Sequence, residues 1–436
     1  MTAKTLVGFY SFNIIIEFTC KLYKKVDKSN IQCYIWTMID RNIANTIKNY
    51  SLEYPIIAVV GPRQSGKTTL VKSLFPQYQY ISLESIDNRE RAISDPRGFL
   101  DDCGSMVILD EIQRTPDLFS YLQEYVDRTH IAAQFILTGS HQFLLMEKIS
   151  QSLAGRIITF KLFPFTMNEL YYSSHDRKLS RIFSPVKRNI ETIPKLEEII
   201  LKGMYPPIHD KELTSSMWLR NYLETYIERD VRSILNIGDI RSFENFIKII
   251  AGNSGQLINY SAISNRIGIS QPTVKRWLSI LEASGIIFIL QPHYKNFNKR
   301  LVKTPKLFFV DTGLMCFLLS IKTEEQLLTH PLYGNIFETF IISEIFKRIS
   351  HLGKKPNIFF WRDKTGNEID LIIEDGMELL PIEIKLSKTF SPSFINGIQK
   401  WLDLNGNSCS KGIVLYGGEN VVGSKNQISA YPWYFI

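Results

Sequence analysis

A continuous apolar segment that runs directly into a glycine-rich turn constrains the fold of this 436-residue chain more than any other feature. Residues 54–60 read YPIIAVV, the composition of a strand that is buried on both faces of a parallel sheet. The turn over residues 61–69 reads GPRQSGKTT, which has the spacing G-x4-G-K-T, and a helical pattern follows it. A strand, a glycine-rich turn and a helix in this order predict an α/β core of the P-loop type.

The residue types in this turn suit the binding of phosphate groups. Gly61 and Gly66 let the backbone curl so that its N–H groups point inward, and the following helix presents its positive end to the same anion. We expect Lys67 to reach the outer phosphates of ATP and the Thr68 hydroxyl to ligate Mg²⁺. The predicted nucleotide-binding residues of the turn are Gly61, Pro62, Arg63, Gln64, Ser65, Gly66, Lys67, Thr68 and Thr69.

Two further apolar segments end in polar residues that suit hydrolysis. The segment SMVIL is followed by Asp110, expected to hold the magnesium through water, and by Glu111, expected to orient and deprotonate the attacking water. The segment QFIL is followed by Thr138, which can sense the terminal phosphate. Arg156 is a candidate to stabilise charge in the transition state, within the chain or from a neighbouring subunit, and an ordinary surface arginine is the alternative. The predicted catalytic residues are therefore Glu111, Lys67 and Arg156.

Several segments resemble a known family. They are GPRQSGKTTL, ILDEIQRTPDLFSYLQEYVD, FILTGSHQFLLM, LAGRI and WLRNYLETYIERDVRSI. Over residues 38–436 the chain resembles the large bacterial and archaeal group of AAA+-like ATPases that carry a C-terminal domain of unknown function. The resemblance implies that Asp110 and Glu111 form a Walker B pair and that Thr138 begins the first sensor. It also suggests Arg229 as a phosphate sensor, with a helix-surface salt bridge as the equal alternative.

One residue departs from the pattern of this family. Many of its members have two glycines before a Tyr-Pro pair in the connecting region, whereas this chain has Gly203 followed by Met204. The difference affects a turn and leaves the predicted catalytic residues unchanged.

A helix-turn-helix pattern lies between residues 241 and 300. A helical pattern over residues 262–267 is followed by a glycine turn and by a second helix, for which Ser270 is a good N-cap. The apolar strand 286–290 and the basic segment 293–303 are expected to form a wing. The candidates to face the major groove of DNA are Gln271, Thr273, Lys275 and Arg276. The alternative is that the same module packs proteins together.

Residues 301–436 carry acids and a lysine in an arrangement similar to that of the PD-(D/E)xK nuclease superfamily. Asp370 lies in one expected strand, and Glu383 and Lys385 lie two residues apart on the next, so that both project from one face. Asp370 and Glu383 can share Mg²⁺ or Mn²⁺, Glu338 on an upstream helix can complete the ligand set, and Lys385 can position or activate water. A structural salt bridge, or a nuclease-like fold without activity, is the alternative.

These patterns predict an α/β chain built from consecutive parts. A P-loop ATPase core is followed by a helical lid or linker, a winged-helix-like module and a nuclease-like α/β domain, whose expected ranges are 38–165, 166–240, 241–300 and 301–436. We interpret residues 1–37 as an upstream extension or as the product of a start codon placed too early.

Composition narrows the setting in which the chain works. The net charge of +8 mildly favours an anionic partner, and a solvated basic surface explains it equally well. Five cysteines without metal-ligand spacing fit reduced thiols in a cytoplasmic protein. No uninterrupted apolar run reaches the length of a membrane span, so we expect no membrane partner.

Three functions are compatible with the sequence. The first is Mg²⁺-dependent ATP binding and hydrolysis coupled to conformational change, with nucleic acid bound through residues 241–300 and 301–436. The second is an ATP-regulated, metal-dependent DNA or RNA nuclease, and the third is a nucleotide-gated scaffold with negligible turnover. The nucleic-acid substrate, the biological trigger and the oligomeric state do not follow from the sequence.

Overall fold

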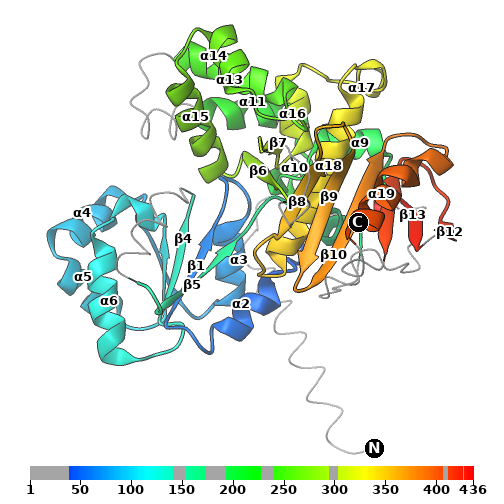
Figure 1. Cartoon of the computed structure of the whole chain (residues 1–436). Helices are drawn as coiled ribbons and strands as arrows, with labels where there is room; N and C mark the ends of the chain where they lie inside the picture. Colours follow the sequence, from blue (N-terminus) through cyan, green and yellow to red (C-terminus); the bar gives the residue numbers. More distant parts are fainter. Residues whose placement is uncertain are drawn as a thin grey trace, which may run out of the picture. The chain divides into compact units, whose positions relative to one another are not determined.

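The computed structural model describes seven stretches of the chain (Figure 1), namely residues 39–140, 153–172, 193–226, 240–293, 303–405, 411–425 and 427–436. Residues 39–436 form one compact unit. The expected extension over residues 1–37 and the candidate Arg229 lie outside the described residues.

Within the described residues, the N-terminal core is a parallel sheet of five strands in the order β2-β3-β4-β1-β5. The strands are β1 Ile56–Val60, β2 Gln79–Ser82, β3 Val107–Asp110, β4 Phe135–Gly139 and β5 Ile157–Lys161. Strand β4 lies between β1, which leads into the glycine-rich turn, and β3, which ends in Asp110. Because all five strands are parallel, their carboxyl ends meet at one edge. The predicted α/β core is confirmed.

Helices cover both faces of this sheet, which explains why every residue of β1 is apolar and buried. Ile56, Ala58 and Val60 pack in one cluster with α4, α5 and α6, whereas Ile57 and Val59 pack in another with α2 and α3. The helices are α2 Ala44–Tyr50, α3 Lys67–Leu74, α4 Ile86–Ser94, α5 Pro96–Cys103, the 3-10 helix η1 Ile112–Arg114 and α6 Leu118–Thr129.

A mainly helical region follows the first sheet. Its helices are α8 Met167–Tyr171, α9 Leu196–Lys202, α10 Pro206–Asp210, α11 Ser215–Tyr226, α13 Ile240–Gly252, α14 Tyr260–Ile267 and α15 Gln271–Ala283. The expected helix-glycine-helix pattern is present, because Gly268 takes the left-handed conformation between α14 and α15 and Ser270 caps α15. Residues 294–302, most of the expected wing, lie outside the described residues.

The C-terminal part holds a second sheet, with eight strands among the described residues in the order β12-β13-β11-β10-β9-β8-β6-β7. The strands are β6 Ile287–Pro292, β7 Lys306–Phe309, β8 Ile358–Arg362, β9 Glu368–Asp375, β10 Glu378–Lys385, β11 Gly412–Tyr416, β12 Val422–Lys425 and β13 Ile428–Pro432. Strand β6 pairs with both β7 and β8. The strand expected to belong to a wing is therefore continuous with the C-terminal sheet.

Helices α18 and α19 pack on this second sheet. Ile382 and Leu415 share a buried cluster with α18, whereas Ile372 and Val414 share another with α19, so the two helices cover opposite faces. The remaining elements are α16 Thr312–Leu318, α17 Glu324–Thr329, α18 Tyr333–His351, α19 Asn396–Asn405 and the 3-10 helices η5 Pro392–Ile395 and η7 Trp433–Phe435.

Among the helices of the described residues, none has the length and apolar character needed to cross a membrane.

Candidate nucleotide site and acidic pocket

The glycine-rich turn adopts the curled conformation that its composition predicts. Gly66 has a φ of 91° at the start of α3, a conformation that favours glycine. Gly61 lies against the carbonyl of Leu162, and a Cβ placed on Gly61 would be 2.0 Å from that oxygen. The first glycine is therefore required by a close approach of two backbone segments as well as by its own φ of 155°.

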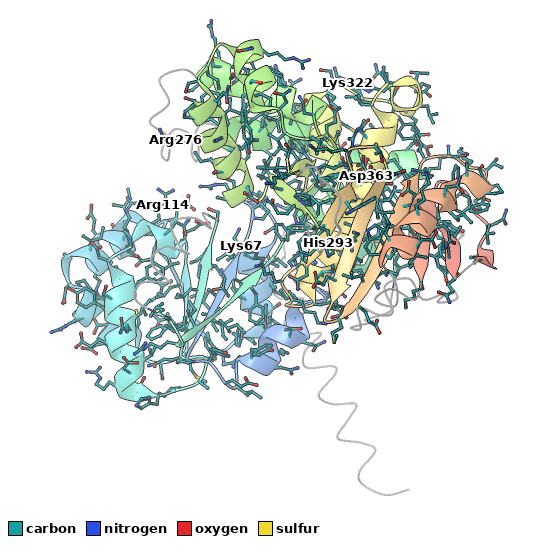
Figure 2. The ribbon with its side chains drawn as sticks, viewed as in Figure 1. Lys67, Arg114, Arg276, His293, Lys322 and Asp363 are labelled. Atoms are coloured by element: carbon teal, nitrogen blue, oxygen red, sulfur yellow. The ribbon has the colours of Figure 1, made fainter. Side chains whose placement is uncertain are left out.

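Lys67 is buried at the base of this turn (Figure 2). Its ammonium group donates hydrogen bonds to the carbonyl oxygens of Gly61, at 3.0 Å, and Pro62, at 2.8 Å. These bonds hold the lysine across the turn, where its positive charge suits an anion bound by the same backbone.

The Asp110 carboxylate accepts hydrogen bonds from three hydroxyl groups at the carboxyl edge of the sheet. Thr68 donates to its carboxylate at 3.2 Å and Tyr80 at 2.7 Å, and the Thr138 hydroxyl also donates to it. Burial, together with the hydrogen bond to Asp110, raises the pKa of Tyr80 to about 12, so the phenol remains protonated and a donor. The residues expected to act on magnesium and on the terminal phosphate are thus in direct contact.

Glu111 follows Asp110 with a φ of 57°, an uncommon conformation for a residue that is not glycine. Its carboxylate accepts hydrogen bonds from the Gln113 amide and from the Ser140 hydroxyl, the latter at 3.2 Å. Backbone strain of this kind costs about 1–3 kcal/mol and persists where surrounding contacts fix it. Gln113 and Ser140 provide such contacts and aim the carboxylate.

Arg156 does not join this cluster. Its backbone carbonyl accepts from Ile56 at the beginning of β1, so it lies at the amino-terminal edge of the parallel sheet, opposite the glycine-rich turn. Its guanidinium group ion-pairs with Asp127 of α6, which raises the pKa of Arg156. A role of Arg156 at the nucleotide of its own chain is therefore wrong, because the residue lies at the opposite edge of the sheet. The alternative role at a neighbouring subunit stays a prediction.

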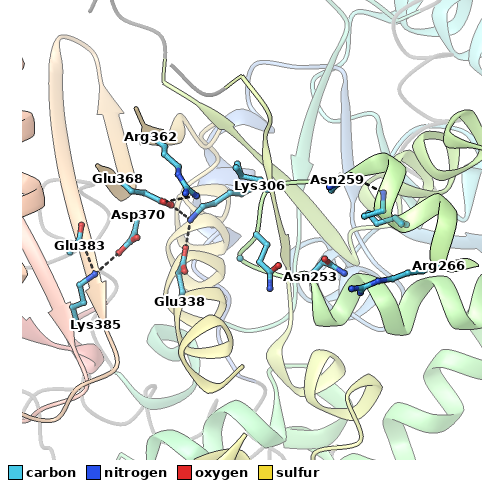
Figure 3. Close-up of a pocket in the computed structure, with 15 residues that line it drawn as sticks. Asn253, Asn259, Arg266, Lys306, Glu338, Arg362, Glu368, Asp370, Glu383 and Lys385 are labelled. Atoms are coloured by element: carbon cyan, nitrogen blue, oxygen red, sulfur yellow. Dashed lines mark hydrogen bonds and ion pairs between the residues drawn. The ribbon is translucent and has the colours of Figure 1, made fainter. Parts of the chain in front are cut away.

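A second site is a pocket of about 700 Å³ in the C-terminal part (Figure 3). The four residues of the nuclease-like pattern, Glu338, Asp370, Glu383 and Lys385, all line it. The other lining residues are Lys306, Arg362 and Glu368 beside the acids, and Asn253, Gly255, Gln256, Leu257, Asn259, Ala262, Ile263 and Arg266 from α14 and the segment that joins it to α13. The first helix of the helix-turn-helix therefore forms a wall of the acidic pocket.

Positive side chains neutralise most of the acids in this pocket. The Lys306 ammonium lies 3.0 Å from a Glu338 oxygen and 2.6 Å from a Glu368 oxygen. The Lys385 ammonium lies 2.5 Å from a Glu383 oxygen and 3.8 Å from an Asp370 oxygen. Figure 3 shows both lysines reaching between pairs of carboxylates.

The acids nevertheless remain crowded. Burial raises the pKa of Glu338 to about 7, although Lys306 opposes the shift. Burial and the Asp370 carboxylate raise the pKa of Glu383 to about 8. Both carboxyl groups thus resist ionisation, chiefly because they are buried.

The same residues include oxygen atoms that suit a divalent cation. One oxygen of Glu383 is buried without a hydrogen-bond partner among the described residues, and Asp370 and Glu383 offer the hard oxygen ligands that Mg²⁺ and Mn²⁺ prefer. Across the same described ranges, however, no three acidic, histidine or cysteine side chains are grouped as a metal site. Lysines thus pair with all three predicted metal ligands, Lys306 with Glu338 and Lys385 with Asp370 and Glu383, and their role as cation ligands stays a prediction.

The candidate DNA-facing residues lie on the first half of α15. Gln271, Lys275 and Arg276 are exposed, and Thr273 is half-buried. The Lys275 ammonium lies 5.3 Å from the centre of the Tyr260 ring. Exposure is compatible with a nucleic-acid contact and with an ordinary solvated helix face.

Several residues of both sites escaped the sequence analysis. Tyr80 and Gln113 contact the predicted acids, yet isolated polar residues near strand ends carry no distinctive spacing. Glu368 could have been found, because it lies two residues before Asp370 on the same strand and so shares its face. Lys306 follows a segment without a motif, and only the tertiary structure brings it to Glu338.

Comparison with known proteins places most of the chain in three family segments. Residues 53–171 match the family described as AAA domain. Residues 193–325 and 333–436 match two families, each described as a domain of unknown function, DUF8612 and DUF4143.

The chain also has relatives that match it over most of their length. An uncharacterized protein of Mycobacterium tuberculosis is 26% identical over 399 residues, which cover 90% of this chain and 83% of the relative. One from Methanocaldococcus jannaschii is 25% identical over 434 residues, covering 91% and 86%. Among solved structures, a Walker-type ATPase of Pyrococcus abyssi aligns with a TM-score of 0.41 and 17% identity, covering 64% of this chain and 96% of that one.

Proposed function

We propose that this chain, which carries an AAA+-like P-loop ATPase domain over residues 53–171, binds ATP with Mg²⁺ and hydrolyses it. The observation that carries the proposal is the contact of Asp110 with the hydroxyls of Thr68 and Thr138, beside the Lys67 turn. A hydroxyl, a carboxylate and an ammonium group at one sheet edge are the parts that phosphoryl transfer requires.

Each of these residues has a separate task in the proposed reaction. The backbone of residues 61–66 and the Lys67 ammonium hold the phosphates, and Thr68 and Asp110 would hold Mg²⁺, which neutralises phosphate charge when bound. Glu111 accepts a proton from water as the water oxygen bonds the terminal phosphorus and the bond to the bridging oxygen breaks. ADP and phosphate are the products, and Thr138 contacts the phosphate that leaves.

Replacement of Glu111 by Gln tests the proposed base. The amide keeps the size of the side chain but accepts no proton, so we expect hydrolysis to fall on the order of 100-fold while ATP still binds. Glu90→Gln, an exposed position on α4, is the matched control and should leave both binding and hydrolysis unchanged. Unchanged hydrolysis in Glu111→Gln would favour the nucleotide-gated scaffold, in which there is little turnover to lose.

A metal-dependent nuclease is the second candidate function, because Glu338, Asp370, Glu383 and Lys385 share one pocket. In this proposal Asp370 and Glu383 hold the cation and Lys385 stabilises charge on the phosphate that is attacked. The test compares Asp370→Ala with Asp375→Ala, an exposed acid on the same strand, on DNA and RNA with Mg²⁺ or Mn²⁺. Cleavage lost only in Asp370→Ala supports a nuclease, and absence of cleavage in the wild type removes it.

Nucleic acid is the partner that we propose for the downstream parts of the chain. Its support is the exposure of Lys275 and Arg276 on the second helix of the helix-turn-helix. Replacing each by Ala should weaken binding to duplex DNA in fluorescence anisotropy, and each lost phosphate contact should lower the salt slope by about 0.9. Lys322→Ala, an exposed lysine outside the module, is the control. Equal affinity in all three variants would point to a protein-packing module.

A further inference from the structure

A buried arginine upstream of β1 contacts the glycine-rich turn from behind. Arg41 is 6% exposed, and its guanidinium group donates to the carbonyl oxygen of Ser65 at 2.8 Å and to that of Phe163 at 2.7 Å. Ser65 belongs to the turn, and Phe163 follows Leu162, whose carbonyl packs against Gly61. Arg41 therefore ties together the two backbone segments that shape the nucleotide turn.

The third donor of this guanidinium group, Nε, contacts Glu169. Arg41 donates from its Nε to Glu169 at 3.1 Å, and both side chains are almost fully buried. Glu169 also closes the N-terminal capping box of α8 by accepting from the backbone of Thr166. Burial would raise the pKa of Glu169, but Arg41 and His351 outweigh it and hold that pKa well below its usual range. The carboxylate is thus a charged, fixed anchor for Arg41.

His351, the last residue of α18, links the Glu169 carboxylate to the C-terminal part of the chain. The backbone N–H of Phe163 donates to Nε2 of His351 at 3.1 Å, which leaves the ring proton on Nδ1. That Nδ1 lies 3.2 Å from the carboxylate of Glu169. Burial lowers the pKa of His351, which favours the neutral ring. His351 thus contacts both Glu169 and the segment behind the turn.

Helix α18 is held against the same segment at two further points. Glu344 accepts from the backbone N–H of Met167 at 2.8 Å, and the Lys347 ammonium donates to the carbonyl of Phe165 at 2.9 Å. Both side chains are buried. The end of α18 therefore cannot shift without moving residues 163–169, and these residues carry the contacts of Arg41 and Gly61.

We propose that Arg41 is a positioning residue for the nucleotide turn, and that helix α18 sets its position through Glu169 and His351. Arg41 touches no atom of the nucleotide in this account and acts through the Ser65 carbonyl. A shift of α18 changes the Glu169 anchor, releases Arg41 from Ser65 and alters the shape of the turn that holds the phosphates. The inference rests on the proposed binding of ATP at this turn.

The test measures the affinity of a fluorescent ATP analogue for the full chain by titration. Arg41→Gln removes the charge and most donors, and we expect binding to weaken on the order of tenfold. His351→Leu, which never touches the turn, should weaken binding in the same direction by roughly threefold or more. Arg41→Lys keeps a charge beside Glu169 and should fall between the wild type and Arg41→Gln. Tyr226→Phe, which removes a buried hydrogen bond to Ser284, should bind like the wild type.

The double variant distinguishes a relay from two separate defects. If Arg41 and His351 act in one chain of contacts, Arg41→Gln with His351→Leu binds no more weakly than Arg41→Gln alone. Additive losses, or wild-type affinity in either single variant, would overturn the inference. If Arg41→Gln fails to fold, His351→Leu combined with Arg41→Lys provides the same comparison.

Lys67→Ala separates this inference from the proposed function. If the wild type binds ATP, Lys67→Ala loses binding and Arg41→Gln keeps it, then only the proposed role of Arg41 and α18 is wrong. Where the wild type itself does not bind ATP, both the proposed function and the relay are wrong.

Discussion

Glu338 and His351 lie on the same helix, α18, and serve different sites: Glu338 ion-pairs with Lys306 in the acidic pocket, and His351 contacts Glu169 behind the nucleotide turn. At 1.5 Å per residue, the helix separates them by roughly 20 Å. A single rigid element is thus fixed at both sites. We expect an ATP analogue to slow amide hydrogen exchange along α18 in the wild type and to leave it unchanged in Arg41→Gln. Equal slowing in both proteins would contradict a connection through Arg41.

Gly61 offers a test of the close approach at the nucleotide turn. In Gly61→Ala the new Cβ meets the Leu162 carbonyl at 2.0 Å, so the turn must open and ATP binding should be lost. Gly104→Ala is the matched control, because its φ of 66° is also unfavourable for alanine but nothing lies within 4 Å of the new atom. That control should lower the free energy of unfolding by about 1–2 kcal/mol and bind ATP normally. ATP binding by Gly61→Ala equal to that of the control would refute the steric account.

Arg156 should be dispensable for hydrolysis in the isolated chain, since it pairs with Asp127 at the far edge of the sheet. We expect Arg156→Ala to hydrolyse ATP at the wild-type rate in dilute protein. A loss that appears only at concentrations where the chain self-associates would support a role at a neighbouring subunit. A loss at every concentration would show that Arg156 acts within its own chain.

The Lys306 ammonium group stabilises the acidic pocket, and we expect a bound metal cation to replace its charge in part. Lys306→Met removes a buried ammonium group from between Glu338 and Glu368, which should lower the free energy of unfolding by about 3–5 kcal/mol at pH 8. Mn²⁺ should raise the melting temperature of this variant more than that of the wild type, because a cation replaces the lost charge. Lys322→Met, an exposed lysine, should respond like the wild type. An Mn²⁺ response that is the same in Lys306→Met and the wild type would show that no cation takes the place of the Lys306 ammonium group.

The buried side chain of His209 should make the stability of the fold depend on pH. Burial lowers the pKa of His209 from 6.5 to about 4, while its Nε2 lies 2.8 Å from the Gly203 carbonyl oxygen. Because the folded pKa is lower than the unfolded one, this contribution is complete above pH 6.5 and is lost as the pH falls toward 4. His209→Gln keeps a donor but does not titrate, so its melting temperature should fall less steeply over that window. The same dependence of melting temperature on pH in both proteins would contradict this role of His209.

The sequence predicts those parts of the structure that local chemistry determines. Strand β1, the turn and α3 follow from an apolar run and two glycines, and Ser270 and Gly268 mark the ends of α15 and α14. The grouping of Asp370, Glu383 and Lys385 follows from strand periodicity.

Contacts between residues far apart in sequence were not predictable in this way. Arg41 and Lys306 carry no motif, and their importance depends on Glu169 and Glu338, to which tertiary packing brings them. The position of Arg156 was not predictable for the same reason, because a Gly-Arg pair does not indicate at which edge of the sheet the arginine lies. Long-range ion pairs therefore mark the limit of what spacing alone can supply.

The proposed ATPase activity is tested most directly by measuring Mg²⁺-dependent ATP hydrolysis by the purified chain and by Lys67→Ala, with and without nucleic acid. We expect hydrolysis by the wild type that needs Mg²⁺ and is lost in Lys67→Ala, because the ammonium group that spans the turn is gone. Stimulation by DNA or RNA would identify the partner as nucleic acid. Hydrolysis that persists unchanged in Lys67→Ala, or no hydrolysis by the wild type under any of these conditions, would contradict this proposal.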